Sequence, residues 1–119
     1  MSRVAVLAGI AAMVFASTAS GGVYARISAN WNAPGTVAIS VLSDHSFNGT
    51  VENACAATAA GATDTDETHP LDQWVYDAVA HQYVDNTSFD ISAAGTGANC
   101  TITVMSGKKL LAQQKYVSV

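Results

Sequence analysis

The chain has 119 residues, a formal net charge of −4, and hydrophobic residues at 50% of its positions. Lys and Arg together number only 5, which excludes a strongly basic surface and makes nucleic acid a poor partner. Much of the hydrophobic fraction is alanine, so the core must be built from a few Val, Ile, Leu and aromatic side chains. A domain with such a core gains most from a covalent cross-link.

The first 19 residues have the order of a secretory leader. Arg3 precedes an apolar segment of 12 residues, and Ser17 and Ala19 suit the small-residue positions before a cleavage site. We therefore expect a signal peptide over residues 1–19 and one domain over residues 20–119 that is secreted, periplasmic or on the cell surface. The alternative is an uncleaved membrane anchor, and only then would the protein be attached to a membrane.

Two cysteines, Cys55 and Cys100, stand on either side of a long insertion. In an exported chain such a pair predicts one disulfide. Neither cysteine has CxxC spacing or an adjacent histidine, which disfavours a metal site or a reactive thiol. Closing this loop is expected to stabilise the domain by about 2–4 kcal/mol through the lost entropy of the unfolded chain.

Alternation of apolar and polar side chains predicts strands at the start of the domain. Residues 23–29 alternate, and residues 36–43 do so with Val37, Ile39 and Val41 on one side. A Pro-Gly turn separates the two segments. They therefore predict a first hairpin.

The middle of the domain is less regular. Residues 51–60 fit either a helix or a strand, because alanine is common in them. Residues 61–69 contain no large apolar side chain and predict an exposed acidic loop. Pro70 suits the first turn of a helix, and apolar residues follow it at helical spacing. One short helix around residues 70–81 is therefore predicted. Strand-forming residues are also frequent there, so the choice between helix and strand stays open for residues 71–84.

The last third predicts strands again. Residues 89–93 alternate between apolar and polar side chains. In residues 100–105 the apolar side chains of Cys100, Ile102 and Val104 point inward and the threonines between them point outward. Residues 106–107 predict a turn into a final strand over residues 108–119. Short strands at this spacing, with one bridge, predict a mostly β fold class, a small immunoglobulin-like β-sandwich with one disulfide.

Three segments resemble the final hairpin of the small actinobacterial membrane-linked MmpS proteins: Phe-Asp-Ile-Ser-Ala at 89–93, Asn-Cys-Thr-Ile-Thr-Val at 99–104, and Gly-Lys at 107–108. The resemblance covers about 20 residues. It implies an immunoglobulin-like β domain outside the membrane. It also implies a role as an extracytoplasmic accessory of a membrane exporter for a lipid or siderophore.

Carboxylates and one imidazole gather in the predicted acidic loop and just after it. The predicted ligands are Asp64, Asp66, Glu67, His69 and Asp72. Oxygen ligands of this kind suit Ca²⁺, although the order lacks the glycine and the closing glutamate of an EF-hand. A solvated acidic loop is the competing interpretation, and we expect no other cofactor.

Chemistry-bearing pairs and motifs are few. Asp77 and His81 would be neighbours on a helix, either for proton transfer or as a surface ion pair. The sequence contains no G-x-S-x-G and no H-E-x-x-H motif, so an enzyme is the less favoured class. Sequons at Asn48 and Asn86 predict glycan sites only in a eukaryotic host, and a third sequon at Asn99 is poorly placed beside a cysteine.

Four large amphipathic aromatic residues either supply the core or form a contact face for a carbohydrate or a protein: Trp31, Trp74, Tyr76 and Tyr83. The favoured function is a non-catalytic secreted or cell-surface β-sandwich domain for binding and interaction. The alternatives are a self-assembling surface or fibre subunit that forms a homo-oligomer through edge strands, an accessory of a membrane exporter, and a small metal-dependent hydrolase.

Overall fold

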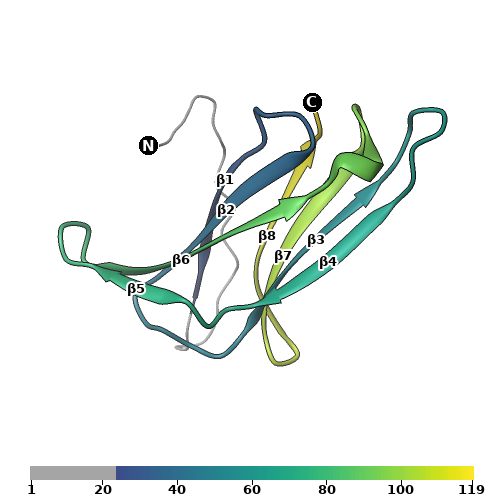
Figure 1. Cartoon of the computed structure of the whole chain (residues 1–119). Coiled ribbons are helices and arrows are strands. Elements are labelled where there is room, and N and C mark those ends of the chain that lie inside the picture. The colour runs from purple at the N-terminus through teal and green to yellow at the C-terminus, as the bar shows by residue number, and fades with distance from the viewer. Residues whose placement is uncertain (1–23) are drawn as a thin grey trace.

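The computed structural model describes residues 24–119, which contain eight strands and one short 3-10 helix joined by turns and loops (Figure 1). The predicted signal peptide over residues 1–19 lies outside the described residues. In chain order the elements are β1 (Arg26–Asn30), β2 (Thr36–Ser43), β3 (Thr50–Ala56), β4 (Thr65–Pro70), β5 (Trp74–Asp77), β6 (Gln82–Asp90), η2 (Ser92–Ala94), β7 (Asn99–Ser106) and β8 (Lys109–Val117). The mostly β fold class predicted from the sequence is confirmed.

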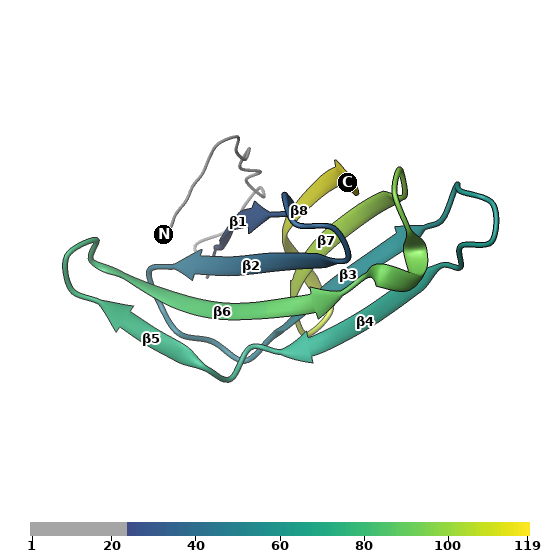
Figure 2. The same ribbon diagram turned by 45° about the horizontal axis from the view of Figure 1, so that its top comes forward.

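The strands form two four-stranded antiparallel sheets (Figure 2). The first sheet has the order β1-β2-β6-β5 and the second has the order β4-β3-β7-β8. The chain passes from the second sheet to the first between β4 and β5, and returns through η2 before β7. No helix in the described residues has the length and apolar character that crossing a membrane requires.

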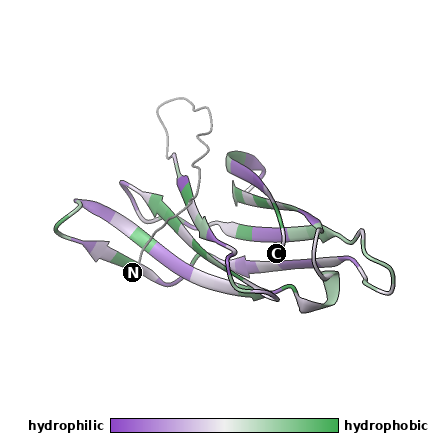
Figure 3. Cartoon of the chain, turned by 90° about the horizontal axis from the view of Figure 1, so that it is seen from above, coloured by the Kyte–Doolittle hydropathy of each residue, from purple (hydrophilic) through white to green (hydrophobic). Residues whose placement is uncertain are grey.

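Alternation of side chains along the strands builds the core between the sheets (Figure 3). Val37, Ile39 and Val41 of β2 are fully buried, as the sequence pattern predicts. Ile102 and Val104 of β7 face them from the second sheet and are equally buried. The period-2 pattern therefore identifies the inner face of each central strand correctly, because a strand exposes successive side chains on opposite sides.

Cys55 and Cys100 form the predicted disulfide, and no free cysteine is present. The two residues lie directly opposite each other on β3 and β7, so the bridge joins neighbouring strands of one sheet. Side chains that face each other in an antiparallel pair are close enough for such a link. A disulfide is typical of proteins in an oxidising, extracytoplasmic compartment.

The helix predicted around residues 70–81 is wrong. Residues Trp74–Asp77 form β5, which pairs with β6, and a turn follows. An isolated helix of this length is marginal in water, whereas pairing with β6 satisfies the backbone of a segment rich in strand-forming residues. The helical spacing of its apolar residues is a coincidence of composition, since Val75 and Val79 lie exposed.

The predicted acidic loop over residues 61–69 is only partly correct. Its second half is β4, an edge strand whose side chains are exposed or half-buried. A strand at a sheet edge can be polar on both faces, so hydropathy alone does not distinguish it from a loop. The ambiguous segment before it contains β3, and the final hairpin turns one residue later than expected, at residues 107–108.

Candidate binding surface

The four aromatic residues singled out from the sequence occupy three different places. Trp31 stacks on Tyr116, with ring centroids 4.8 Å apart, and supports the core. Trp74 packs against Phe47 and donates its indole N–H to the Phe47 carbonyl at 2.9 Å. Both tryptophans are therefore largely structural. Only the two tyrosines remain for a contact face.

Tyr76 and Tyr83 lie opposite each other on β5 and β6, with ring centroids 5.0 Å apart. They belong to the β5–β6 arm, which we define as residues 74–85, the two paired strands and their turn. The arm extends past the end of the second sheet (Figures 1 and 2). Its free part therefore has a single layer, and side chains there are not covered by an opposing sheet.

Three of the seven large apolar side chains that are exposed among the described residues lie on the arm, and three others lie on β8 or just after it. The exposed fractions are 51% for Tyr76, 65% for Val75 and 92% for Val79. Val75 points to the opposite face of the hairpin from Tyr76, since the two are consecutive in a strand. β5 is also the outer strand of its sheet, so one of its edges pairs with no other described strand. Exposed apolar side chains can mark a contact site, and on the arm they lie on both faces of the hairpin.

The arm is also acidic. The sequence has no Lys or Arg between Arg26 and Lys108, so every formally charged side chain within the arm is a carboxylate at neutral pH. Arg26 of β1 contacts the arm from outside, where its guanidinium donates a hydrogen bond to the Gln82 side chain. Asp77 caps the turn at the tip by accepting hydrogen bonds from the backbone N–H groups of Val79 and Ala80. The expected Asp77–His81 pair on a helix does not form, because both residues lie at this turn, where His81 adopts a positive φ of 57°.

Asp85 anchors the base of the arm. Its side chain faces the interior with 2% exposure and accepts a hydrogen bond from the backbone N–H of Gln73 at 2.8 Å. Burial raises the pKa of Asp85, the Gln73 N–H opposes this change, and the nearby charge of Asp72 adds to it. The carboxylate thus holds the crossover from β4 to β5 in place at some cost in desolvation.

The five predicted metal ligands do not come together. Within residues 24–119, no group of three His, Cys, Asp or Glu side chains is placed to hold an ion. Asp64 instead accepts a hydrogen bond from the backbone N–H of Ala57. Asp66 lies beside Glu52 on the outer face, and hydrogen bonding between the two raises the pKa of Glu52. Because alternate residues of β4 point to opposite faces, ligands that are adjacent in sequence are separated in space.

His69 connects the two sheets. Its ring stacks on the buried Phe89 at a centroid distance of 4.1 Å, and Nδ1 lies 2.7 Å from the Thr87 hydroxyl on β6. Nε2 lies 3.3 Å from the Glu67 carboxylate. A carboxylate, an imidazole and a hydroxyl in line are the groups of an acyl-transfer site. Here Nδ1 and one ring face pack β4 against β6, while Nε2 contacts Glu67 within β4, so the arrangement serves as a link between sheets.

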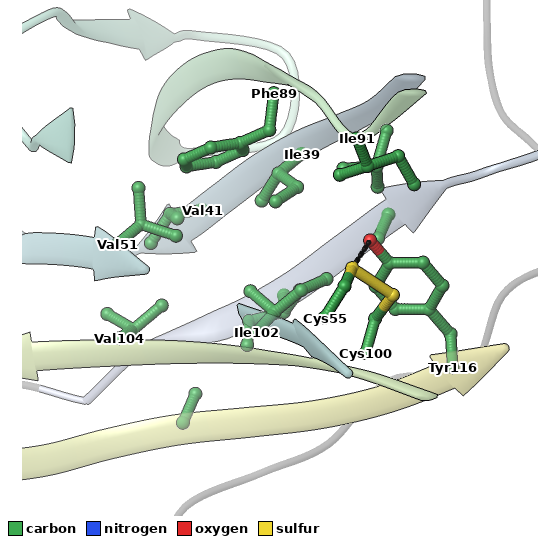
Figure 4. Packing of buried hydrophobic residues seen from close by; sticks show 14 of the residues in the cluster. Ile39, Val41, Val51, Cys55, Phe89, Ile91, Cys100, Ile102, Val104 and Tyr116 are labelled. Atoms are coloured by element: carbon green, nitrogen blue, oxygen red, sulfur yellow. Dashed lines mark hydrogen bonds between the residues drawn. A yellow bond between two sulfur atoms is a disulfide. The ribbon is translucent and has the colours of Figure 1, made fainter. Parts of the chain in front are cut away.

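A second polar network surrounds the disulfide (Figure 4). The Tyr116 hydroxyl donates to Asn53 Oδ1 at 2.8 Å and lies 3.9 Å from Cys55 Sγ. Burial raises the pKa of Tyr116 to about 12, although the hydrogen bond with Asn53 acts in the opposite direction. Sequence reasoning missed this pair. The alternation of side chains along β3 places Asn53 on the same inward face as Cys55. That alternation was the one sign in the sequence that Asn53 is buried.

The sequons predicted for a eukaryotic host are accessible. Asn48 lies exposed in the loop between β2 and β3. Asn86 is exposed on the outer face of β6, where its side chain accepts a hydrogen bond from the Ser40 hydroxyl at 2.6 Å. Asn99 is exposed at the start of β7.

Comparisons of this chain with protein-family models, with curated proteins and with solved structures returned no match. The function of the chain is therefore inferred from the geometry of the molecule itself.

Proposed function

We propose that this protein is a non-catalytic, extracytoplasmic binding domain whose contact surface is the β5–β6 arm. The observation that carries the proposal is the pair formed by the exposed Tyr76 and the half-buried Tyr83 on a hairpin that extends past the two-layer core. Tyrosine supplies a large, rigid contact area at low entropic cost, which is why it is enriched at binding sites. The disulfide and the leader-like residues 1–19 support a secreted, periplasmic or cell-surface location.

The strand order supports an immunoglobulin-like classification. The order β1-β2-β6-β5 corresponds to strands A, B, E and D of that fold, and β4-β3-β7-β8 corresponds to C′, C, F and G. The disulfide differs from the antibody pattern, in which the bridge crosses between the sheets. Here it joins the C and F positions within one sheet.

An extended protein segment is the partner that the arm fits best. Val79 adds aliphatic surface at the tip of the arm and Val75 adds it on the face opposite Tyr76, and the free edge of β5 offers backbone hydrogen bonds to an added strand. The rings of Tyr76 and Tyr83 are tilted by 59° and so do not form one flat platform for a sugar. The charged side chains of the arm itself are carboxylates, and the Arg26 guanidinium beside it is already bonded to Gln82, so a basic and apolar segment is the complementary partner.

The test is selection of peptide ligands on the immobilised, oxidised chain from a displayed library of random peptides. We expect the enriched peptides to alternate apolar and basic residues. Their affinity should fall at least about tenfold, or about 1.4 kcal/mol, in the variant Tyr76→Ser with Val79→Ser. Tyr24→Ser is the matched control, because Tyr24 is similarly exposed at 46% but lies outside the arm.

Two outcomes would contradict the proposal. One is that the enriched peptides bind the arm variant as well as the native chain. The other is that the same variants change binding only on a glycan array, which would assign the arm to carbohydrate. Melting curves of all three proteins exclude loss of fold as the cause.

A further inference from the structure

The two outer edges of the second sheet carry opposite charges. β4 at one edge bears Asp66 and Glu67, and β8 at the other edge bears Lys109 and Lys115. The domain beyond residue 23 has only four Lys and Arg residues, and three of them belong to β8 and the turn before it. Charge is therefore separated across the width of this sheet.

Strand register places these charges in line. Asp66 pairs with Ala54, Ala54 pairs with Thr101, and Thr101 pairs with Lys115. These four residues form one row across the outer face, with a carboxylate at one end and an ammonium group at the other. In the next row, Glu67 lies at the β4 end and Gln114 lies at the β8 end. Gln114 is 2% exposed, and neither polar atom of its side chain has a hydrogen-bond partner among the described residues.

From this row we propose that a second copy of the chain adds its β4 to the β8 edge, so that copies join head to tail into a continuous antiparallel sheet. All strand pairs in the sheet are antiparallel, so β8 of one copy and β4 of a copy placed alongside in the same orientation also run antiparallel. If each row of paired residues continues straight from one copy into the next, Lys115 of one copy faces Asp66 of the next. Glu67 of the incoming copy lies in the row of Gln114, whose amide needs an acceptor.

Electrostatics selects this pairing over the symmetric ones. Joining β4 to β4 would bring carboxylates together, and joining β8 to β8 would bring lysines together, both of which are unfavourable. Charged side chains on an edge strand usually prevent pairing with another chain. Opposite charges on the two edges prevent only the pairing of β4 with β4 and of β8 with β8. A head-to-tail contact of this kind does not close by itself and gives chains of increasing length.

This surface is separate from the β5–β6 arm, so either proposal can fail without the other. β1 lies beside β8 but does not pair with it, so the backbone edge of β8 has no strand partner in the described part of the chain. The docking contact would therefore be made by backbone hydrogen bonds and set in register by the charge pair.

The test is sedimentation velocity of the oxidised chain over a range of concentrations at low and high salt. We expect species larger than a monomer that grow with concentration at low salt and become smaller as salt screens the charge pair. Lys115→Glu alone and Asp66→Lys alone should each remain monomeric, because each variant opposes like charges. Asp44→Lys is the control for Asp66→Lys, since it makes the same change from a negative to a positive charge in an exposed loop outside the second sheet.

Recombining the two changes makes the test specific. An equimolar mixture of the Lys115→Glu and Asp66→Lys proteins should associate again, because each edge then meets an edge of opposite charge on the other protein. One chain that carries both substitutions should also associate. A monomer for the native chain at all concentrations would overturn the proposal, and so would association that is unchanged in Lys115→Glu or a mixture that stays monomeric.

Discussion

The two ends of the molecule are built in opposite ways. At one end the disulfide, Tyr116 and Trp31 fill the space between the sheets, and each of them contacts at least one of the others. At the other end the β5–β6 arm has a single layer, in which the rings of Tyr76 and Tyr83 contact each other across the two strands. Side chains of the same chemical type are therefore structural at one end and available at the other.

This difference indicates how a small domain with an alanine-rich sequence can keep an exposed hairpin of the kind that we propose for binding. The cross-linked end supplies stability that does not depend on the arm. The arm can then carry exposed valine and tyrosine with little effect on folding. Five variants test this separation, and they are given in order of expected effect.

The largest loss is expected for Ile102→Ala in the centre of the second sheet. Ile102 is fully buried, and its truncation removes apolar contact and leaves a cavity. The free energy of unfolding should fall by about 2–5 kcal/mol in urea titrations. Ile102→Val is the control and should lose about 0.5–1.5 kcal/mol. Similar small losses in both variants would mean that the core is loosely packed.

Replacing both cysteines should have the next largest effect. The variant Cys55→Ala with Cys100→Ala lacks the bridge across 45 residues of sequence and should lose about 2–4 kcal/mol in urea titrations. Peptide affinity of the arm should remain unchanged at a temperature where the variant is folded. Loss of that affinity in the folded variant would show that the two ends are coupled.

Tyr116→Phe removes the hydroxyl bound to Asn53 and leaves a buried carbonyl oxygen without its donor. We expect a loss of about 1–3 kcal/mol. Because the folded pKa of Tyr116 is raised from 10.0 to about 12, its contribution is complete below pH 10 and is lost as the pH rises towards 12. Phenolate absorbance should accordingly show a tyrosine that titrates with a pKa of about 12, and its absence would contradict the burial of Tyr116.

Asp85→Asn should have a smaller effect, and one that depends on pH. Burial raises the folded pKa of Asp85 above 3.8, so the native protein loses stability as the pH rises through that folded pKa. The asparagine keeps an acceptor for the Gln73 N–H but has no charge to bury. We expect the variant to melt higher than the native chain at pH 7 and no higher at pH 3. A variant that is less stable at both values would show that the ionised carboxylate is required.

Val79→Ser at the tip of the arm should have the smallest effect. The side chain is 92% exposed, so the free energy of unfolding should change by less than about 0.5 kcal/mol. A loss above 1 kcal/mol, measured in the same urea titrations, would place the arm in the cooperative core and would remove the contrast between the two ends.

Where the sequence predicted the fold correctly, one side of a strand was buried. β2 was predicted with its observed bounds, and the inward residues of β7 were identified, because alternation has a strong signal when one face is apolar. The disulfide was also predicted from two cysteines and a leader-like start. β4 was missed and β5 was left open between helix and strand, because neither strand buries a side chain and so neither shows alternating hydropathy. The other two edge strands, β1 and β8, bury alternate side chains and were predicted.

For the candidate sites, the sequence supplied the residue types but not their grouping. It named Tyr76 and Tyr83 among four aromatic residues, and only the hairpin showed that these two lie together while the tryptophans pack inward. The sequence by itself determined the class of fold and the covalent link, because both depend on local pattern and composition. The tertiary structure decided which residues share a surface: the tyrosine pair, and the row from Asp66 to Lys115, join residues from different strands whose register is set by the packing of the whole sheet.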